Sequence, residues 1–246
     1  MAIDHYFGHS LGDRIAPDFN LGGHLPVGDL SMTKAFVSYH HDNDQRFREH
    51  LAYLATFYHA FEDGSVEVGD IDDDLSSEAI RRIIRDDYLG DTQVTILLCG
   101  TETRFRKHID WELKSSMIDG AVNRRSGILV IELPSASSNH WFAGLPGEKD
   151  AIYPDYTGGW TAIETKAEQQ ERHPHLPERI IDNLMKPGVA MSVVPWSRIE
   201  NQPDNLRFLV DSTATAGRNN DYDLSLPMRR KNHNPTLAQS YLSHFQ

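Results

Sequence analysis

The stretch QVTILLCGTETRFRKHIDWELKSSM, residues 93–117, joins an apolar run to a segment with helical spacing. Residues 93–100 are almost entirely apolar or β-forming, as expected of a strand that is covered on both faces of a sheet. After it, Ile109, Leu113 and Met117 recur four residues apart, which places them on one face of a helix. A buried strand followed by a helix is the repeating unit of a parallel sheet, so this stretch predicts an α/β fold.

The same alternation continues in both directions along the chain. Further strands are predicted at 34–39, 58–63, 127–133 and 189–196, and further helices at 42–58, 75–89, 177–188 and 203–217. Asp44 is the candidate N-cap of the first helix, and Ser76 or Ser77 that of the second. Five strands alternating with helices predict a flavodoxin-like, doubly wound parallel sheet. Ligands of such sheets bind outside the carboxyl ends of the strands.

The two ends of the chain lack this regularity. Residues 1–32 are predicted to be an N-terminal extension, 33–218 the domain, and 219–246 a C-terminal tail. Within the domain, a long region after 133 reads as irregular, with the turn-like YPDYTGGW. The acidic segment 62–74 reads as a solvated loop.

Composition excludes several classes of protein. The formal charge is −12, from 36 acidic and 24 basic residues, so nucleic acid is not an expected partner. No apolar run approaches the ~20 residues that span a bilayer, and no secretory signal is present, so we expect no membrane partner and a cytoplasmic location. The single cysteine, Cys99, excludes an intramolecular disulfide, and its place in an apolar run favours core packing.

Motifs for common cofactors and metals are missing. The sequence has no G-x-G-x-x-G and no G-x-x-x-x-G-K-[ST], and its 13 histidines form no H-E-x-x-H. Asp70, Asp72 and Asp74 imitate the start of a calcium loop, but Leu75 and Arg81 occupy its glycine and glutamate positions. No metal site is expected; ligation by the HPH of 173–175 is improbable.

Glu112 is the carboxylate most in need of explanation. It lies early in a helix that follows a central strand, where the helix dipole favours an anion. Ile109 and Leu113 bury the neighbouring face, which would turn Glu112 toward the crevice at the strand ends. Arg106 and Lys107 add local positive charge, so we expect an exposed carboxylate whose pKa is not raised far.

Three segments together resemble a TIR domain. They are KAFVSYHHDND (34–44), SSEAIRRIIRDDYLGDTQVTILLCGTETRFRKHIDWELKSSM (76–117) and GILVIEL (127–133). More narrowly, residues 33–135 are similar to the TIR-like proteins of bacterial Thoeris antiphage systems. The resemblance implies a TIR fold and an NAD⁺ glycohydrolase or ADP-ribosyl cyclase, with Glu112 as its essential carboxylate.

The resemblance also implies substrate contacts and partners. Contacts are expected from the end of the first strand, at Ser38, Tyr39, His40 and His41. Where the family commonly has an aromatic residue four positions before the glutamate, this chain has His108, with Trp111 adjacent; Arg106 is a further candidate for the substrate. NAD⁺ would be a substrate rather than a cofactor, and its ADP-ribose-derived product, expected to be cyclic, would signal to a separate effector protein.

Activation is expected to involve a homo-oligomer. Two alternatives remain open: a non-catalytic TIR adaptor, and a nucleoside-processing transferase on a similar sheet.

Overall fold

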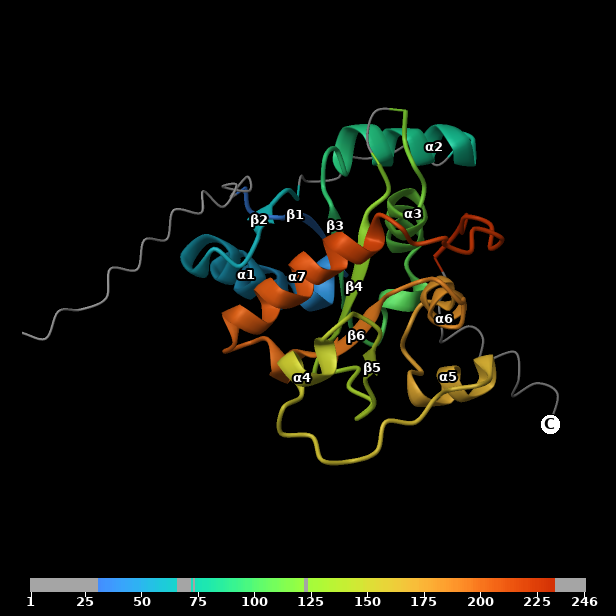
Figure 1. Cartoon of the computed structure of the whole chain (residues 1–246). Coiled ribbons are helices and arrows are strands. Elements are labelled where there is room, and N and C mark those ends of the chain that lie inside the picture. Colours follow the sequence, from blue (N-terminus) through green and yellow to red (C-terminus); the bar gives the residue numbers. More distant parts are fainter. Residues whose placement is uncertain (1–30, 66–71, 73, 122–123, 233–246) are drawn as a thin grey trace, which may run out of the picture. The chain divides into compact units, whose positions relative to one another are not determined.

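The computed structural model describes residues 31–65, 72, 74–121 and 124–232, and Figure 1 shows their helices and strands. Nearly all of the expected N-terminal extension and residues 233–246 lie outside the described residues. So does most of the acidic segment 62–74, together with the rejected calcium-loop position Asp70.

The described chain forms a six-stranded sheet with the order β2-β1-β3-β4-β6-β5. The strands are β1 (Lys34–Ser38), β2 (Glu62–Asp63), β3 (Val94–Cys99), β4 (Gly127–Glu132), β5 (Phe142–Ala143) and β6 (Ser192–Pro195). The first five in the spatial order are parallel, and β5 pairs antiparallel with β6 at the edge. The predicted doubly wound α/β fold is confirmed, with one antiparallel edge strand that was not predicted.

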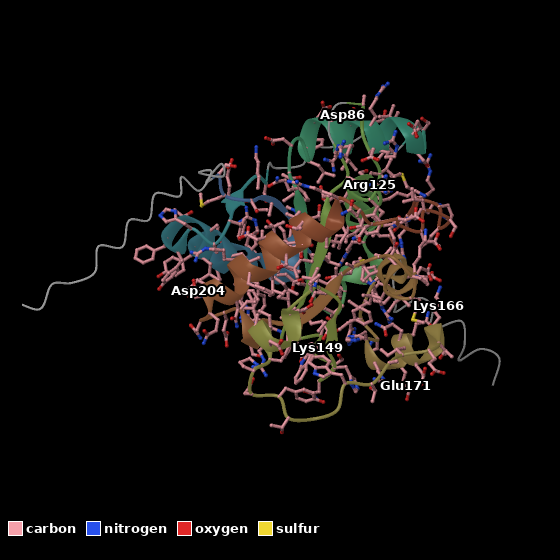
Figure 2. The ribbon with its side chains drawn as sticks, viewed as in Figure 1. Asp86, Arg125, Lys149, Lys166, Glu171 and Asp204 are labelled. Carbon is pink, nitrogen blue, oxygen red and sulfur yellow. The ribbon has the colours of Figure 1, made fainter. Side chains whose placement is uncertain are left out.

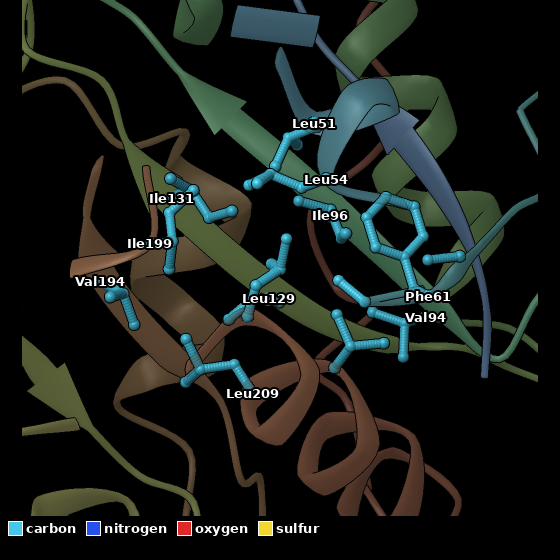
Figure 3. Close-up of a cluster of buried hydrophobic side chains, with 14 of the residues drawn as sticks. Leu51, Leu54, Phe61, Val94, Ile96, Leu129, Ile131, Val194, Ile199 and Leu209 are labelled. Atoms are coloured by element: carbon cyan, nitrogen blue, oxygen red, sulfur yellow. The ribbon is translucent and has the colours of Figure 1, made fainter. Parts of the chain in front are cut away.

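Helices cover both faces of the sheet (Figure 1). On one face lie α1 (His41–Tyr58) and α7 (Pro203–Gly217); on the other lie α2 (Ser77–Ile83), α3 (Lys107–Ser116) and α6 (Glu178–Leu184). Successive side chains of β3 alternate between the two cores: Ile96 packs with α1 and α7, whereas Leu97 packs with α3 and α6. Figure 3 shows the first of these cores.

One close approach fixes α7 on the sheet. A Cβ atom at Gly217 would lie 2.2 Å from the Cα of Gly127, so only glycine lets the end of α7 contact the start of β4.

The helix starts agree only in part with the prediction. Ser76 caps α2 by accepting a hydrogen bond from the Ala79 N–H, as expected. The Asp44 prediction was wrong, because the His40 ring caps α1 and Asp44 lies inside its first turn. Asp44 is buried and packs against Gly100, where a Cβ would lie 2.7 Å from its carboxylate.

Two regions expected to be irregular are more ordered than predicted, the first in its secondary structure and the second in its packing. Besides β5, the region after residue 133 holds α4 (Glu148–Ile152) and α5 (Lys166–Arg172). The described part of the expected tail packs on the domain, with Tyr222 and Met228 buried. None of the described helices has the length and apolar content that crossing a bilayer requires.

Candidate functional site

The strand order reverses beside β1, and this topology sets the position of the site. From β1 the chain first adds β2 on one side and then crosses to β3 on the other. The switch point of a doubly wound sheet therefore lies between the carboxyl ends of β1 and β3, where such folds bind ligands. Ser38 ends β1, and α3, which follows β3, carries Glu112.

Ser38 and Glu112 form a direct pair at this point. The Ser38 hydroxyl donates to Glu112 Oε2 at 2.6 Å, a distance typical of a hydrogen bond to an ionised carboxylate. Both side chains are buried, Glu112 being 6% exposed. Residues 74 positions apart in the sequence thus meet because β1 and β3 are neighbouring strands.

A cavity of about 270 Å³ opens onto Glu112. Its lining includes Tyr39 and His41, whose rings stack with centroids 4.3 Å apart, and Ser65 after β2. The cavity exists because β2 pairs with β1 only at Lys34 and Ala35, which leaves the rest of that edge of β1 without a strand partner in the described chain. Its volume is slightly below the ~300–1,000 Å³ typical of small-molecule sites.

Helix α1 supplies the polar wall of the cavity. Gln45, Arg48 and Glu49 line it, and their spacing places them on one helix face. The Arg48 guanidinium pairs with Asp63 at 2.7 Å, with 16% and 23% of the two side chains exposed. This pair holds a cation beside the cavity that contains Glu112.

Sequence reasoning missed these α1 residues, although a signal was present. Positions 45, 48, 49 and 52 form a stripe next to the apolar stripe that contains Phe47, Leu51 and Leu54. Since α1 begins at the carboxyl end of β1, its first turns must border the site.

Burial changes the expected electrostatics of Glu112. Desolvation raises its pKa from 4.5 to about 7, and the Ser38 hydrogen bond only partly opposes this. The expectation of an exposed carboxylate with a nearly ordinary pKa was wrong. Arg106 is engaged elsewhere, in an ion pair with Glu102 at 2.6 Å, and Glu112 lies in the second turn of α3 rather than at its start.

The other predicted contacts lie away from the cavity lining. His40 is buried, and its Nδ1 accepts the Asn43 N–H as the cap of α1; burial is the main cause of its lowered pKa. Trp111 is 1% exposed and donates its indole N–H to the Arg229 carbonyl, so it is a core residue that cannot stack on a base. His108 packs edge-on against Trp111.

A second polar cluster lies at the carboxyl end of β4. The His173 ring contacts the Glu132 carboxylate at 2.8 Å, and both side chains are almost completely buried. The HPH segment lies in the connection between α5 and α6, and its first histidine is buried. Cys99 is also buried, which raises its pKa. Across the described chain, no group of three or more His, Cys, Asp or Glu is placed to hold a metal ion.

The arrangement combines a buried anion, a hydroxyl that orients it, a stacked pair of rings and a cation around one small cavity. Such a site can bind one flat, positively charged end of a ligand and stabilise positive charge that develops beside Glu112.

Comparison with known proteins agrees with this topology. No curated protein matches the sequence significantly. Residues 36–138, which contain Ser38, Glu112 and the residues of α1, match the family described as Thoeris protein ThsB, TIR-like domain. Over these residues the chain is therefore similar to the TIR-like domain of Thoeris ThsB proteins.

Proposed function

We propose that this protein is an NAD⁺ glycohydrolase or ADP-ribosyl cyclase of antiphage defence, with Glu112 as its catalytic carboxylate. The observation that carries the proposal is the Glu112 carboxylate, which is hydrogen-bonded to Ser38 and faces a cavity at the switch point of the sheet. A single carboxylate suits cleavage of NAD⁺, because the nicotinamide leaves as a neutral base and needs no general acid.

The reaction breaks the bond between the ribose C1′ and the nicotinamide nitrogen. The bonding electron pair passes to the nitrogen and neutralises the pyridinium, while positive charge develops on the ribose as an oxocarbenium ion. Ionised Glu112 would stabilise this charge, because an anion in a water-poor site acts far more strongly than in bulk water. Water then attacks C1′ and releases a proton to the solvent, which gives ADP-ribose. Alternatively, a nucleophile of the same molecule attacks C1′ to give a cyclic product.

Other cavity residues have roles that follow from their chemistry. The stacked Tyr39 and His41 rings offer a flat surface for the nicotinamide, and Arg48 offers donors to an amide or phosphate oxygen. The cavity of about 270 Å³ suits the nicotinamide riboside end of NAD⁺ rather than the whole molecule.

Chromatography of the products after incubation with NAD⁺ tests the proposal. Purified protein, with and without lysate of infected cells, should release nicotinamide and an ADP-ribose-derived product that signals to a separate effector. Unchanged NAD⁺ under both conditions, together with effector activation by mixing the two proteins alone, would favour the adaptor. Turnover of nucleosides instead of NAD⁺ would favour the transferase.

We also propose that self-association accompanies activation. Three neighbouring aromatic side chains near the end of α1 are exposed: Tyr53 by 49%, Phe57 by 66% and Tyr58 by 41%. Exposed apolar clusters of this kind often mark protein interfaces. Phe57→Glu should lower the fraction of oligomer, measured by sedimentation, and the rate of the activated protein, each by a few fold. An unchanged oligomer would contradict this use of the surface.

A further inference from the structure

A second cavity lies at the opposite edge of the sheet from Glu112. Its volume is about 470 Å³, and its wall includes β5 and residues from the segment between β5 and α5. Glu112 lines a cavity beside β1, whereas β5 is the last strand at the other edge of the sheet. The region after residue 138 is also outside the family match, so this cavity is a feature of the remaining part of the chain.

Aromatic rings form much of this wall. Trp141, Tyr156 and Trp160 meet edge to face, with centroid distances of 5.3 Å for Trp141 and Tyr156 and 5.2 Å for Tyr156 and Trp160. Tyr156 and Trp160 are each 37% exposed, so their rings remain available to a ligand. Rings held in this way suit a flat partner such as a nucleobase, because any base can stack on an aromatic side chain.

The charge of the cavity is the reverse of the charge of the protein. The chain carries a net charge of −12, yet the described lining contains Lys149, Arg172 and His140 and no Asp or Glu. Within the described residues, neither Lys149 nor Arg172 forms an ion pair with a carboxylate. Lys149 instead lies over the Trp160 ring at 4.8 Å, and Figure 2 shows it on α4.

We propose that this cavity binds a nucleoside phosphate as a second site, separate from the Glu112 cavity. The base packs against Tyr156 and Trp160, and the phosphate pairs with Lys149 and Arg172. Arg172 is already oriented by donating to the Thr161 hydroxyl at 3.1 Å, and a guanidinium can hold phosphate oxygens with two parallel hydrogen bonds. The combination of rings and cations selects a molecule that is both flat and anionic.

Isothermal titration calorimetry with AMP tests this proposal without any dependence on NAD⁺ cleavage. AMP should bind, while adenosine and inorganic phosphate, each offering half of the contacts, should bind at least about tenfold more weakly. Trp160→Ala and Lys149→Gln should each lower the affinity for AMP about tenfold. Because both side chains are exposed, neither change should disturb folding, and circular dichroism checks this.

Two control variants make the result specific. Arg82→Gln removes an exposed cation on α2 and should leave AMP affinity unchanged. Glu112→Gln should also leave it unchanged, which separates this site from the proposed active site. The proposal is overturned if AMP does not bind at millimolar concentration, or if Trp160→Ala and Lys149→Gln bind AMP as tightly as the wild type.

Discussion

The described part of the domain contains two buried serine–glutamate pairs, and they differ in access and in hydrogen bonding. Ser38 donates to Glu112 beneath the end of β1, and the Ser192 hydroxyl donates to Glu148 beneath β6. Burial raises the pKa of each glutamate to about 7. However, Glu112 faces a cavity, whereas Glu148 is 0% exposed and also accepts the Leu145 N–H at 3.0 Å.

The comparison shows that a raised pKa alone does not identify a reactive carboxylate. Glu148 has both oxygens engaged by its own domain, so it holds the turn before α4 in place. Glu112 has one hydrogen bond from Ser38 and borders space that a ligand can enter. Access, not acidity, separates the proposed catalytic group from the structural one.

The largest effect that we expect from the burial of these glutamates is on the free energy of unfolding. A carboxyl group with a folded pKa of about 7 and an unfolded value of 4.5 binds a proton in the folded state that the unfolded state has lost. The free energy of unfolding due to this group is therefore highest below pH 4.5, falls as the pH rises to about 7, and is constant above that. The total loss is about 3 kcal/mol.

Glu112→Gln should thus be more stable than the wild type by up to about 3 kcal/mol at pH 8 and equally stable near pH 4. Glu148→Gln should gain less, because a glutamine amide replaces one of two engaged acceptors. Urea denaturation across this pH range measures both. Equal stability of wild type and Glu112→Gln at pH 8 would show that Glu112 is not desolvated.

The pH dependence of turnover is the next largest effect. Since the ionised form of Glu112 stabilises the oxocarbenium ion, kcat/KM for NAD⁺ should rise with pH and level off above about 7. Between pH 7 and pH 5 it should fall by up to about a hundredfold, tenfold for each unit. Glu148→Gln should keep the same profile, and a profile that is flat from pH 5 to pH 8 contradicts the role of Glu112.

A smaller effect comes from the two serines. Ser38→Ala removes the hydrogen bond that partly lowers the pKa of Glu112, so that pKa should rise further. At pH 7 the rate should fall up to about tenfold and recover toward pH 9. Ser192→Ala is the matched control and should leave the rate unchanged. Loss of activity in Ser38→Ala at every pH to the same extent would point to a different role for the hydroxyl.

The long apolar strands could be predicted from the sequence. The short elements could not, because tertiary contacts determine their structure. Short apolar runs such as 93–100 and 127–133 are typical of central strands, so the sheet and its carboxyl edge could be predicted from them. β5 has two residues and α4 has five, too few for a periodic signal. For α5, the capping box of Thr165 and Glu168 was a usable signal that the irregular reading overlooked.

In the site, too, only the features that do not depend on tertiary contacts could be predicted from the sequence. Ser38 and Glu112 could be placed together because both positions follow from the topology. The burial of Trp111 could not, because it depends on the described part of the C-terminal segment, where the Arg229 carbonyl accepts its indole N–H. Nor does local sequence reveal that β2 stops after two residues and leaves the cavity open.

The most direct test of the central claim is the rate of nicotinamide release from NAD⁺ by wild type, Glu112→Gln and Glu148→Gln at pH 8. At that pH both glutamates are ionised in the wild type. Each variant makes the same change of a buried carboxylate to an amide, and Glu102→Gln controls for an exposed one. Glu112→Gln should lose on the order of 10²–10³ in rate, as expected when one electrostatic contribution to the transition state is removed. Glu148→Gln and Glu102→Gln should remain close to the wild type. Wild-type nicotinamide release by folded Glu112→Gln would contradict the account.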